Sequence, residues 1–264
     1  MAEFRVRILL ALLGALPFAG AAEPDAKAVQ VVAVSYNIRT AYADESDAKL
    51  GNDWPKRKPL ALKMIQDLDP DIVGIQEATE GQVRDLQEGF EAFQKVELAF
   101  LHRPDRLQAL EGGFLTLGAF GNPDPWGDRW VLWQRFRPRG GGPAFVVVMT
   151  HLSTAKDNLP QAVRVLDLAV EKGRDGTPLL VMGDFNFDAA PMLAKRGFQD
   201  ALTDKKGTFH AFKGGREGER IDFIGVKGFK VVGEGVYTRM EGKGAETIYP
   251  SDHYPIWAKV VLTR

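Results

Sequence analysis

The 264-residue chain contains no cysteine. Disulfide bonds, thiolate zinc sites and a cysteine nucleophile are therefore all excluded. Charge of either sign is not in excess, because 34 Lys and Arg against 35 Asp and Glu give a formal net charge of −1. A protein that binds nucleic acid tightly through its phosphates is expected to be strongly basic. This balance argues against processive DNA or RNA binding but allows an enzyme that contacts phosphate with the help of a metal.

Long apolar runs are scarce, and the clearest one lies near the N-terminus. Two arginines precede an apolar stretch over residues 8–18, and the sequence AGA follows at residues 19–21. A charged start, a short apolar region and an A-x-A site are typical of a secretory signal peptide. The stretch is also short for a membrane span. We therefore expect residues 1–21 to be a signal peptide and residues 22–264 a single domain, exported to the periplasm or the medium without stable membrane insertion.

Strand and helix patterns alternate along the rest of the chain. Apolar residues at helical spacing predict helices within residues 52–71, 80–90, 158–173 and 190–197. Short apolar runs predict strands within residues 29–40, 71–78, 95–103, 106–118, 129–137, 144–153, 177–186, 220–226 and 253–262. Helices mixed with strands, with no linker long enough to separate two cores, favour a single α/β domain.

Polar side chains capable of chemistry occupy the ends of these strands. They are Asn37, Glu77, His151, Asp184, Asn186, Asp222, Asp252 and His253. Each alone could be a cap or a turn residue, but together they could converge on one rim of a sheet, where α/β folds bind ligands. In the sequence GDFN, residues 183–186, the glycine would allow a tight turn. Asp184 and Asn186, two residues apart, would share one face of an extended strand end.

These residue types indicate a particular chemistry. Carboxylates and amides without cysteine favour a hard cation, Mg²⁺ first with Mn²⁺ or Ca²⁺ as alternatives, over zinc. Two imidazoles near such an ion suit an anionic substrate whose transition state gains negative charge. Phosphoester hydrolysis needs these parts, namely a metal, a positioned water and donors to the phosphate oxygens. The expected partner is therefore a phosphoester, with nucleic acid as one candidate, and no protein partner is evident.

Six motifs in order, YNIR, DIVGIQE, THLS, GDFN, RIDFI and SDHYPI, resemble those of the endonuclease/exonuclease/phosphatase superfamily. The resemblance runs from Val31 to Leu262, and the sequence KKGTFHAFKGG is similar to the bacterial secreted metal-dependent hydrolase branch. It implies a four-layer α/β sandwich, in which two packed mixed β-sheets are flanked by helices. It also implies a secreted Mg²⁺-dependent hydrolase, with a phosphodiesterase or nuclease ranked first. A phosphatase, a sphingomyelinase-like phospholipid phosphodiesterase and a non-catalytic binding module of the same fold are the alternatives.

The resemblance also assigns metal and water roles to matched positions. Glu77 would be the anchoring metal ligand, with Asn37 beside it and Asp252 close to the ion. Asp184 would orient or deprotonate the attacking water, and Asn186 would hold a water or a phosphate oxygen.

The two histidines have roles in the same resemblance. His151 would donate to the phosphate, and His253, oriented by Asp222, would be either the base or a second phosphate donor. We favour Asp184 as the residue that acts on the water and His253 as the residue that stabilises transition-state charge.

The substrate side departs from the family pattern. A loop rich in Gly and Asp is missing between Phe93 and Glu97, together with a glutamate that would steady His151. Glu97 is the nearest candidate for that role, one residue out of register. The family tends to have tyrosine where this chain has His102.

Three residues are predicted substrate contacts, each with an ordinary alternative. Arg129 resembles a phosphate-contacting arginine but could stack on Trp126 or Trp130. His102 could be a strand-surface residue, and His210 an exposed loop histidine. The tryptophans at positions 54, 130, 133 and 257 are predicted to be core or near-core residues and not a base-stacking platform, and Asp188 a turn residue.

Overall fold

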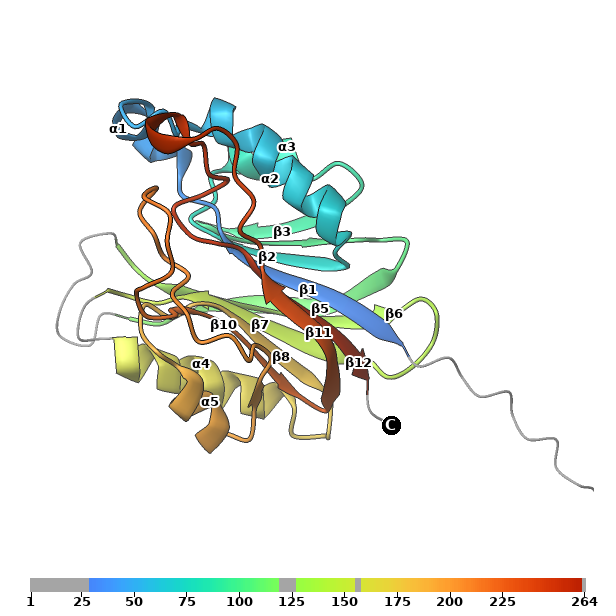
Figure 1. Ribbon diagram of the computed structural model, residues 1–264. Coiled ribbons are helices and arrows are strands. Elements are labelled where there is room, and N and C mark those ends of the chain that lie inside the picture. Colours follow the sequence, from blue (N-terminus) through green and yellow to red (C-terminus); the bar gives the residue numbers. More distant parts are fainter. Residues whose placement is uncertain (1–28, 119–126, 155–157, 263–264) are drawn as a thin grey trace, which may run out of the picture.

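A computed structural model describes residues 29–118, 127–154 and 158–262. Two six-stranded mixed β-sheets pack against each other, with α2 and α3 outside one sheet and α4 and α5 outside the other (Figure 1). This arrangement confirms the predicted four-layer α/β sandwich. The predicted signal peptide, residues 1–21, lies outside the described residues.

The first sheet has the strand order β11-β12-β1-β2-β4-β3. Its strands are β11 (Phe229–Val236), β12 (Ile256–Leu262), β1 (Gln30–Asn37), β2 (Ile72–Gln76), β4 (Leu98–His102) and β3 (Glu91–Lys95). β1 and β2 are parallel, and the other neighbouring pairs are antiparallel. All five residues of β2 are buried, as expected for a central strand covered on both faces.

The second sheet has the strand order β5-β6-β7-β8-β10-β9. Its strands are β5 (Leu107–Thr116), β6 (Trp130–Pro138), β7 (Phe145–His151), β8 (Leu179–Asp184), β10 (Asp222–Lys227) and β9 (Gln199–Asp200). β7 and β8 form the one parallel pair of this sheet in the described part of the chain, and both strands are buried along their whole length.

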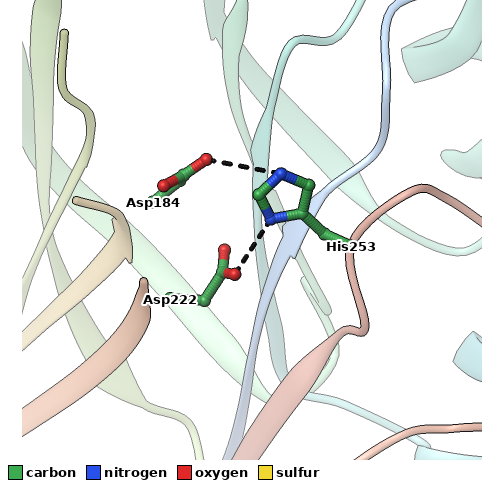
Figure 2. A group of neighbouring side chains, drawn as sticks. All are labelled: Asp184, Asp222 and His253. Atoms are coloured by element: carbon green, nitrogen blue, oxygen red, sulfur yellow. Dashed lines mark hydrogen bonds and ion pairs between the residues drawn. The ribbon is translucent and has the colours of Figure 1, made fainter. Parts of the chain in front are cut away.

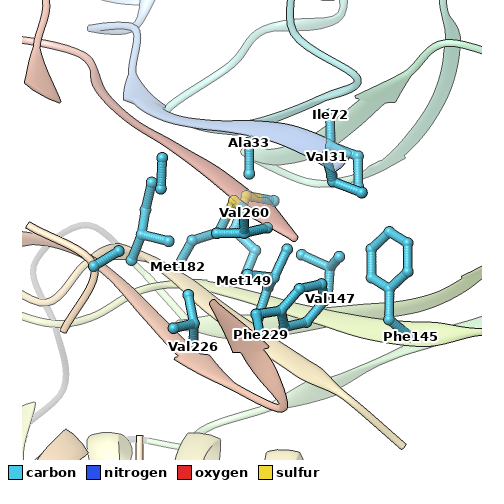
Figure 3. Close-up of a cluster of buried hydrophobic side chains, with 14 of the residues drawn as sticks. Val31, Ala33, Ile72, Phe145, Val147, Met149, Met182, Val226, Phe229 and Val260 are labelled. Atoms are coloured by element: carbon cyan, nitrogen blue, oxygen red, sulfur yellow. The ribbon is translucent and has the colours of Figure 1, made fainter. Parts of the chain in front are cut away.

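The core between the sheets follows from alternation along the strands. Val147 and Met149 of β7 face the first sheet (Figure 3). Val146 and Val148 pack on the other face in a second cluster, with residues of α4. Gly74 of β2 lies where the two sheets approach closely. A Cβ atom there would lie 2.6 Å from the Met182 sulfur and 2.8 Å from that of Met149, so a larger side chain would force both methionine side chains to move.

The helices form the outer layers. They are η1 (Ala41–Ala43), α1 (Asp44–Ala48), α2 (Trp54–Leu68), α3 (Glu80–Leu86), α4 (Asn158–Lys172), α5 (Ala190–Lys195) and η2 (Gly244–Glu246). α3 begins with a capping box between Thr79 and Gln82. α2 ends at Leu68, and its C-cap Asp69 has a left-handed conformation, one residue before the proline predicted to stop the helix. Among the described residues, no helix has the length and apolar character needed to cross a membrane.

Strand direction brings the predicted polar residues to one edge. Asn37 pairs with the last residue of β2, so the carboxyl ends of β1 and β2 lie together. In the second sheet, His151 pairs with Asp184, and Asp184 pairs with Asp222 at the start of β10. Contacts between β1 and β8 join these two edges into one rim.

Candidate active site

Asn37 joins the two sheets at this rim. Its Nδ2 atom donates to Glu77 Oε1 in the first sheet and to Asp184 Oδ2 in the second, both at 3.1 Å. Its Oδ1 atom accepts from the backbone N–H of Arg39 at 3.1 Å. With all three hydrogen bonds made, the amide orientation is defined, and two carboxylates from distant parts of the chain are held close to each other.

The second group is centred on His253, in the loop before β12 (Figure 2). Its Nδ1 atom lies 2.9 Å from Asp222 Oδ2, and its Nε2 atom lies 3.7 Å from Asp184 Oδ2. Burial would lower the pKa of His253, but the carboxylates of Asp222 and Asp184 outweigh burial and raise it to about 10. In this arrangement, without a metal, the ring is therefore a cation whose Nε2–H points toward Asp184.

His151, at the end of β7, has a carboxylate partner of its own. Its Nδ1 atom lies 3.0 Å from Glu97 Oε2, and its Nε2 atom lies 3.7 Å from Asp184 Oδ2. Burial acts to lower the pKa of His151, but Glu97 and then Asp184 raise it above its ordinary value. The Arg129 guanidinium lies 2.9 Å from Nδ1 and 3.3 Å from Glu97 Oε1. The Glu97 carboxylate can only accept and the Arg129 guanidinium can only donate, so the two compete for Nδ1. The raised pKa of His151 favours the protonated ring, in which Nδ1–H faces Glu97 beside Arg129.

Glu77 follows β2 and turns its carboxylate into the rim. Its backbone φ of 63° is left-handed, which is uncommon outside glycine. Oε2 accepts from the backbone N–H of Thr40 at 3.2 Å. Burial would raise the pKa of Glu77, but the His151 charge and the Asn37 and Thr40 hydrogen bonds hold it below the usual range.

Asp252 faces the same space from the loop before β12. Ser251 Oγ lies 3.2 Å from Asp252 Oδ1 and also donates to the Asn37 carbonyl at 2.6 Å. Burial, with Glu77 nearby, raises the pKa of Asp252 above its ordinary value. The carboxylates at this rim therefore lie close enough to disfavour one another's charge.

Asp184 is the last residue of β8, next to a position that only glycine permits. The tight turn expected at Gly183 is not formed, because Gly183 lies within β8 and pairs with Thr150 and Phe223. Gly183 has a φ of 142°, and a Cβ atom there would lie 2.0 Å from the Thr150 carbonyl oxygen. Burial and the Asp222 charge raise the pKa of Asp184. Asn186 does not continue an extended strand, which corrects the expected shared face. Its φ is 56°, its backbone N–H donates to Asp184 Oδ1 at 2.9 Å, and its Nδ2 donates to the Leu152 carbonyl at 2.8 Å.

A buried arginine connects the loops beneath the rim. Arg57 of α2 is 0% exposed, and its guanidinium donates to the carbonyls of Asn52 at 2.7 Å, Ile38 at 2.6 Å and Arg39 at 3.0 Å. A longer contact of 3.3 Å reaches the Pro250 carbonyl. One side chain thus joins the loop after Asn37 to the loop that carries Asp252 and His253.

The donor set fits a hard divalent cation. Asn37, Glu77 and Asp252 supply amide and carboxylate oxygens, which Mg²⁺ prefers. Burial, and after it a neighbouring carboxylate, raises the pKa of both Asp184 and Asp252, and a bound cation would stabilise their charged forms.

A second group that could hold an ion consists of Asp184, Asp222 and His253, whose ligand atoms all lie within 4.8 Å of one another. In that group, Asp222 Oδ1 is buried without a hydrogen-bond partner among the described residues and could accept an ion. His253 Nδ1 and Asp222 Oδ2, however, already face each other at 2.9 Å, and an ion bound by all three residues would compete with this contact. We therefore favour the oxygen set for the ion.

The three residues predicted to contact substrate lie in three different environments. Arg129 lies at the rim beside His151. His210 is buried, its ring stacked 4.1 Å from that of Tyr254, and its backbone N–H donates to the Asp252 carbonyl at 2.9 Å. Burial lowers the pKa of His210 to about 4. It is therefore a neutral neighbour of the site and not an exposed loop histidine.

His102 requires a correction. It pairs with Ile72, the first residue of β2, whereas the rim lies beyond the last residue of that strand. The side chain is 3% exposed and packs against Phe136. β4 runs antiparallel to β2, so its carboxyl end is at the opposite edge of the sheet. His102 therefore has no place in the substrate contacts that we propose below.

Glu97 is a residue whose importance the sequence did not settle. It lies between β3 and β4 and reaches His151 despite the short connection. The signal in the sequence was a carboxylate next to the missing loop, one residue out of register with the family pattern. Arg57 was missed altogether, because an arginine between two lysines in a helix gives no sign of burial.

The profile of the Endonuclease/Exonuclease/phosphatase family matches residues 34–253. Two solved structures from Bacteroides thetaiotaomicron are similar at 27% sequence identity. One is an endonuclease/exonuclease/phosphatase family protein, with a TM-score of 0.81 over 90% of this chain and 100% of the other. The second is a mannosyl-6-phosphatase, with a TM-score of 0.79 over 88% and 100%.

The human Nocturnin catalytic domain shares the fold, with a TM-score of 0.66 and 19% identity over 89% of this chain and 95% of that domain. No curated protein matches the sequence.

Proposed function

Because the chain belongs to the endonuclease/exonuclease/phosphatase family, we propose that it is an exported hydrolase that uses Mg²⁺ to cleave a phosphate ester. One observation carries this proposal. At a single rim, two buried imidazoles are each held by a carboxylate, at 3.0 Å for His151 and 2.9 Å for His253, beside a cluster of oxygen ligands. Oxygen ligands for a cation, placed next to positively charged hydrogen-bond donors, suit a substrate that is itself an anion.

Asn37, Glu77 and Asp252 would hold the cation, which supplies Lewis-acid polarisation of the phosphate and a lower pKa for a bound water. Asn37 also holds Glu77 and Asp184 close to each other by donating to both. Ser251 and Arg57 hold the backbone that carries these ligands. Mn²⁺ or Ca²⁺ could take the same oxygen set.

Asp184 is proposed to orient the attacking water and accept its proton. Its Oδ1 is occupied by the Asn186 backbone N–H, so Oδ2 is the atom that faces the rim. The raised pKa of Asp184, caused by burial and by Asp222, makes the carboxylate a better proton acceptor than an exposed aspartate. Asn186 acts in this scheme by fixing Asp184 and not by holding substrate.

His151 and His253 are proposed to donate from Nε2 to phosphate oxygens as negative charge develops. In both rings Nδ1 is taken by a carboxylate, so Nε2 is left to face the rim. Such a pair of preorganised donors stabilises the transition state more than the ground state. Their positive charge also neutralises the phosphate when it arrives.

The organic part of the substrate has two main candidates. A phosphodiester, nucleic acid included, is the first expectation from the motifs. A phosphomonoester of a sugar is the second, and the similarity to a mannosyl-6-phosphatase over 88% of this chain favours it. The net charge of −1 also favours a small ester over long nucleic acid. A phospholipid headgroup remains the third candidate.

The test compares the purified wild type with Glu77→Ala on mannose 6-phosphate, bis(p-nitrophenyl) phosphate, plasmid DNA and sphingomyelin, each with Mg²⁺ and with EDTA. We expect turnover in Mg²⁺ on one class and a loss of at least about 100-fold in Glu77→Ala. Glu80→Ala removes an exposed glutamate of α3 and should match the wild type. Failure to cleave any of these esters with Mg²⁺, Mn²⁺ or Ca²⁺ would favour the binding-module alternative. Mass spectrometry of exported material should find residue 22 at its N-terminus.

A further inference from the structure

The rim continues across the second sheet beyond His151. Asp184 of β8 pairs with His151 of β7, and the Thr150–Val131 pair places the start of β6 next to it. Trp130 in turn pairs with Thr116 of β5. Since neighbouring strands are about 4.8 Å apart, Trp130 stands one strand away from His151, on the side opposite Asp184.

The Trp130 side chain lies on the same face of the sheet as the His151 ring. Along β6, Trp130 and Leu132 both pack toward the core between the sheets, as Met149 does two residues before His151. Phe114 of β5 pairs with Leu132 and therefore shares this face. Its ring centroid lies 5.8 Å from that of Trp130, at an interplanar angle of 62°.

Lys95, the last residue of β3 in the first sheet, contacts both rings. Its Nζ atom lies 4.3 Å from the Phe114 ring centroid and 5.0 Å from that of Trp130. Lys95 comes two residues before Glu97, the carboxylate that holds His151. Lys95, Phe114 and Trp130 thus form a corner, here called the aromatic corner, that borders the site on the His151 side.

The aromatic corner is open to solvent although it is built from apolar rings. Phe114 is 44% exposed, and Trp130 and Lys95 are only partly buried. Exposed rings next to charged phosphate donors offer a flat apolar surface and an ammonium group within a few ångströms of each other. A ring that carries hydroxyl or carbonyl groups at its edge matches both features, because its face can stack while its edge accepts from Lys95.

We propose that the aromatic corner binds the ring of the organic group that the phosphate ester carries. The assignment rests on the proposed function, since it assumes that the phosphate lies at His151. An ester with a sugar or nucleobase ring then extends along the sheet toward β5, away from the residues that hold the cation. A linear ester leaves the corner empty and binds more weakly. Phe114 and Trp130 are in this role specificity-determining residues that do not touch the reacting atoms.

The experiment uses phosphonates, which cannot be hydrolysed and so report binding without turnover. Methylphosphonate has no ring, cyclohexylmethylphosphonate has a saturated ring, and benzylphosphonate has an aromatic one. Calorimetry in Mg²⁺ should show that the wild type binds at least one ring-bearing compound about ten-fold more tightly than methylphosphonate. Preference for both rings indicates a sugar-like substrate, and preference for benzylphosphonate alone indicates a nucleobase.

The variants are Phe114→Ala and Phe114→Leu, which remove the flat ring, the second while keeping apolar bulk. Both should reduce the ring preference to less than about three-fold, with unchanged thermal melting. Leu115→Ala is the matched control, because Leu115 is 47% exposed on the same strand and faces the other side of the sheet. An absence of ring preference in the wild type, or the same preference in Phe114→Ala, would overturn the assignment.

Measuring ester cleavage beside phosphonate binding tests the ring-binding assignment independently of the proposed hydrolase function. If esters are cleaved but Phe114→Ala keeps the ring preference, the corner is only the exposed border of the core and the hydrolase proposal stands. If the ring preference depends on Phe114 but no ester is cleaved, the binding assignment stands and the hydrolase proposal fails.

Discussion

Glu97 Oε2 lies 3.0 Å from His151 Nδ1, although the two residues belong to different sheets. The connection between β3 and β4 carries the carboxylate, and the end of β7 carries the ring. The same carboxylate faces Arg129 at 3.3 Å. A single acidic side chain therefore fixes the tautomer of His151 and balances two neighbouring cations.

Replacing Glu97 by alanine should lower kcat by about 10- to 100-fold with a smaller change in KM, because the His151 ring loses its orientation. Glu97→Gln should retain part of the activity, since the amide oxygen can still accept from Nδ1. Steady-state kinetics on the best ester of the panel measures both. Glu91→Ala removes a glutamate at the other end of β3 and should leave kcat unchanged, and an equal loss there would contradict the positioning role.

Asp222→Asn should lower the pKa of His253 from its value of about 10, because the largest charge that favours the protonated ring is removed. NMR titration of the imidazole signals in metal-free protein measures this shift directly. We also expect kcat to fall by about 100-fold or more, since the amide can hold the wrong tautomer. An unchanged His253 titration would show that Asp222 does not set the charge of the ring.

Arg57→Met should destabilise the protein by at least about 2 kcal/mol, because several buried carbonyl groups lose their donors together. The loss should appear as a lower urea midpoint at an unchanged slope. The loops of Asn37 and Asp252 would also move apart, so Mg²⁺ should raise the melting temperature less than in the wild type. Arg84→Met on α3 is the control, because that side chain is 66% exposed and its loss should change stability by less than about 0.5 kcal/mol.

We expect buried His102 to make the folded protein less stable in mild acid. Burial lowers the pKa of His102 below its ordinary value, and Glu91 only partly opposes this. His102 is therefore protonated near pH 6.5 in the unfolded chain but only at lower pH in the folded protein. The free energy of unfolding falls as the pH decreases below about 6.5. Urea unfolding at pH 7.5 and pH 5.5 should show a smaller decrease for His102→Phe than for the wild type. A decrease of equal size in both would exclude His102 as the cause, since His210 and the carboxylates remain.

Much of the site could be predicted because its residues lie at the ends of strongly apolar strands. Asn37, Asp184 and Asp222 pair directly with residues at the same edge, so strand position alone predicted their proximity. His102 also ends an apolar strand, but the direction of that strand relative to its neighbour is a tertiary property that the local pattern does not contain.

The other features that the sequence did not predict also depend on tertiary structure. β3 and β11 were missed because edge strands are partly exposed and tolerate polar residues and glycine, which hides their alternation. The left-handed conformation of Asn186 reflects a side-chain hydrogen bond to the backbone that local spacing could not reveal. Glu97 and Arg57 act across long separations in sequence, so their contacts depend on the assembled fold.

The division of the site between the sheets has a consequence for how the enzyme acquires activity. Asn37 and Glu77 belong to one sheet and His151 and Asp184 to the other, and they meet only where the sheets dock. A refolding intermediate with one sheet formed would show part of the native circular dichroism but would lack the assembled site. The rate at which catalytic activity returns during refolding therefore measures the rate at which the two sheets dock. Fragments of the chain produced by proteolysis would have no activity until they reassociate.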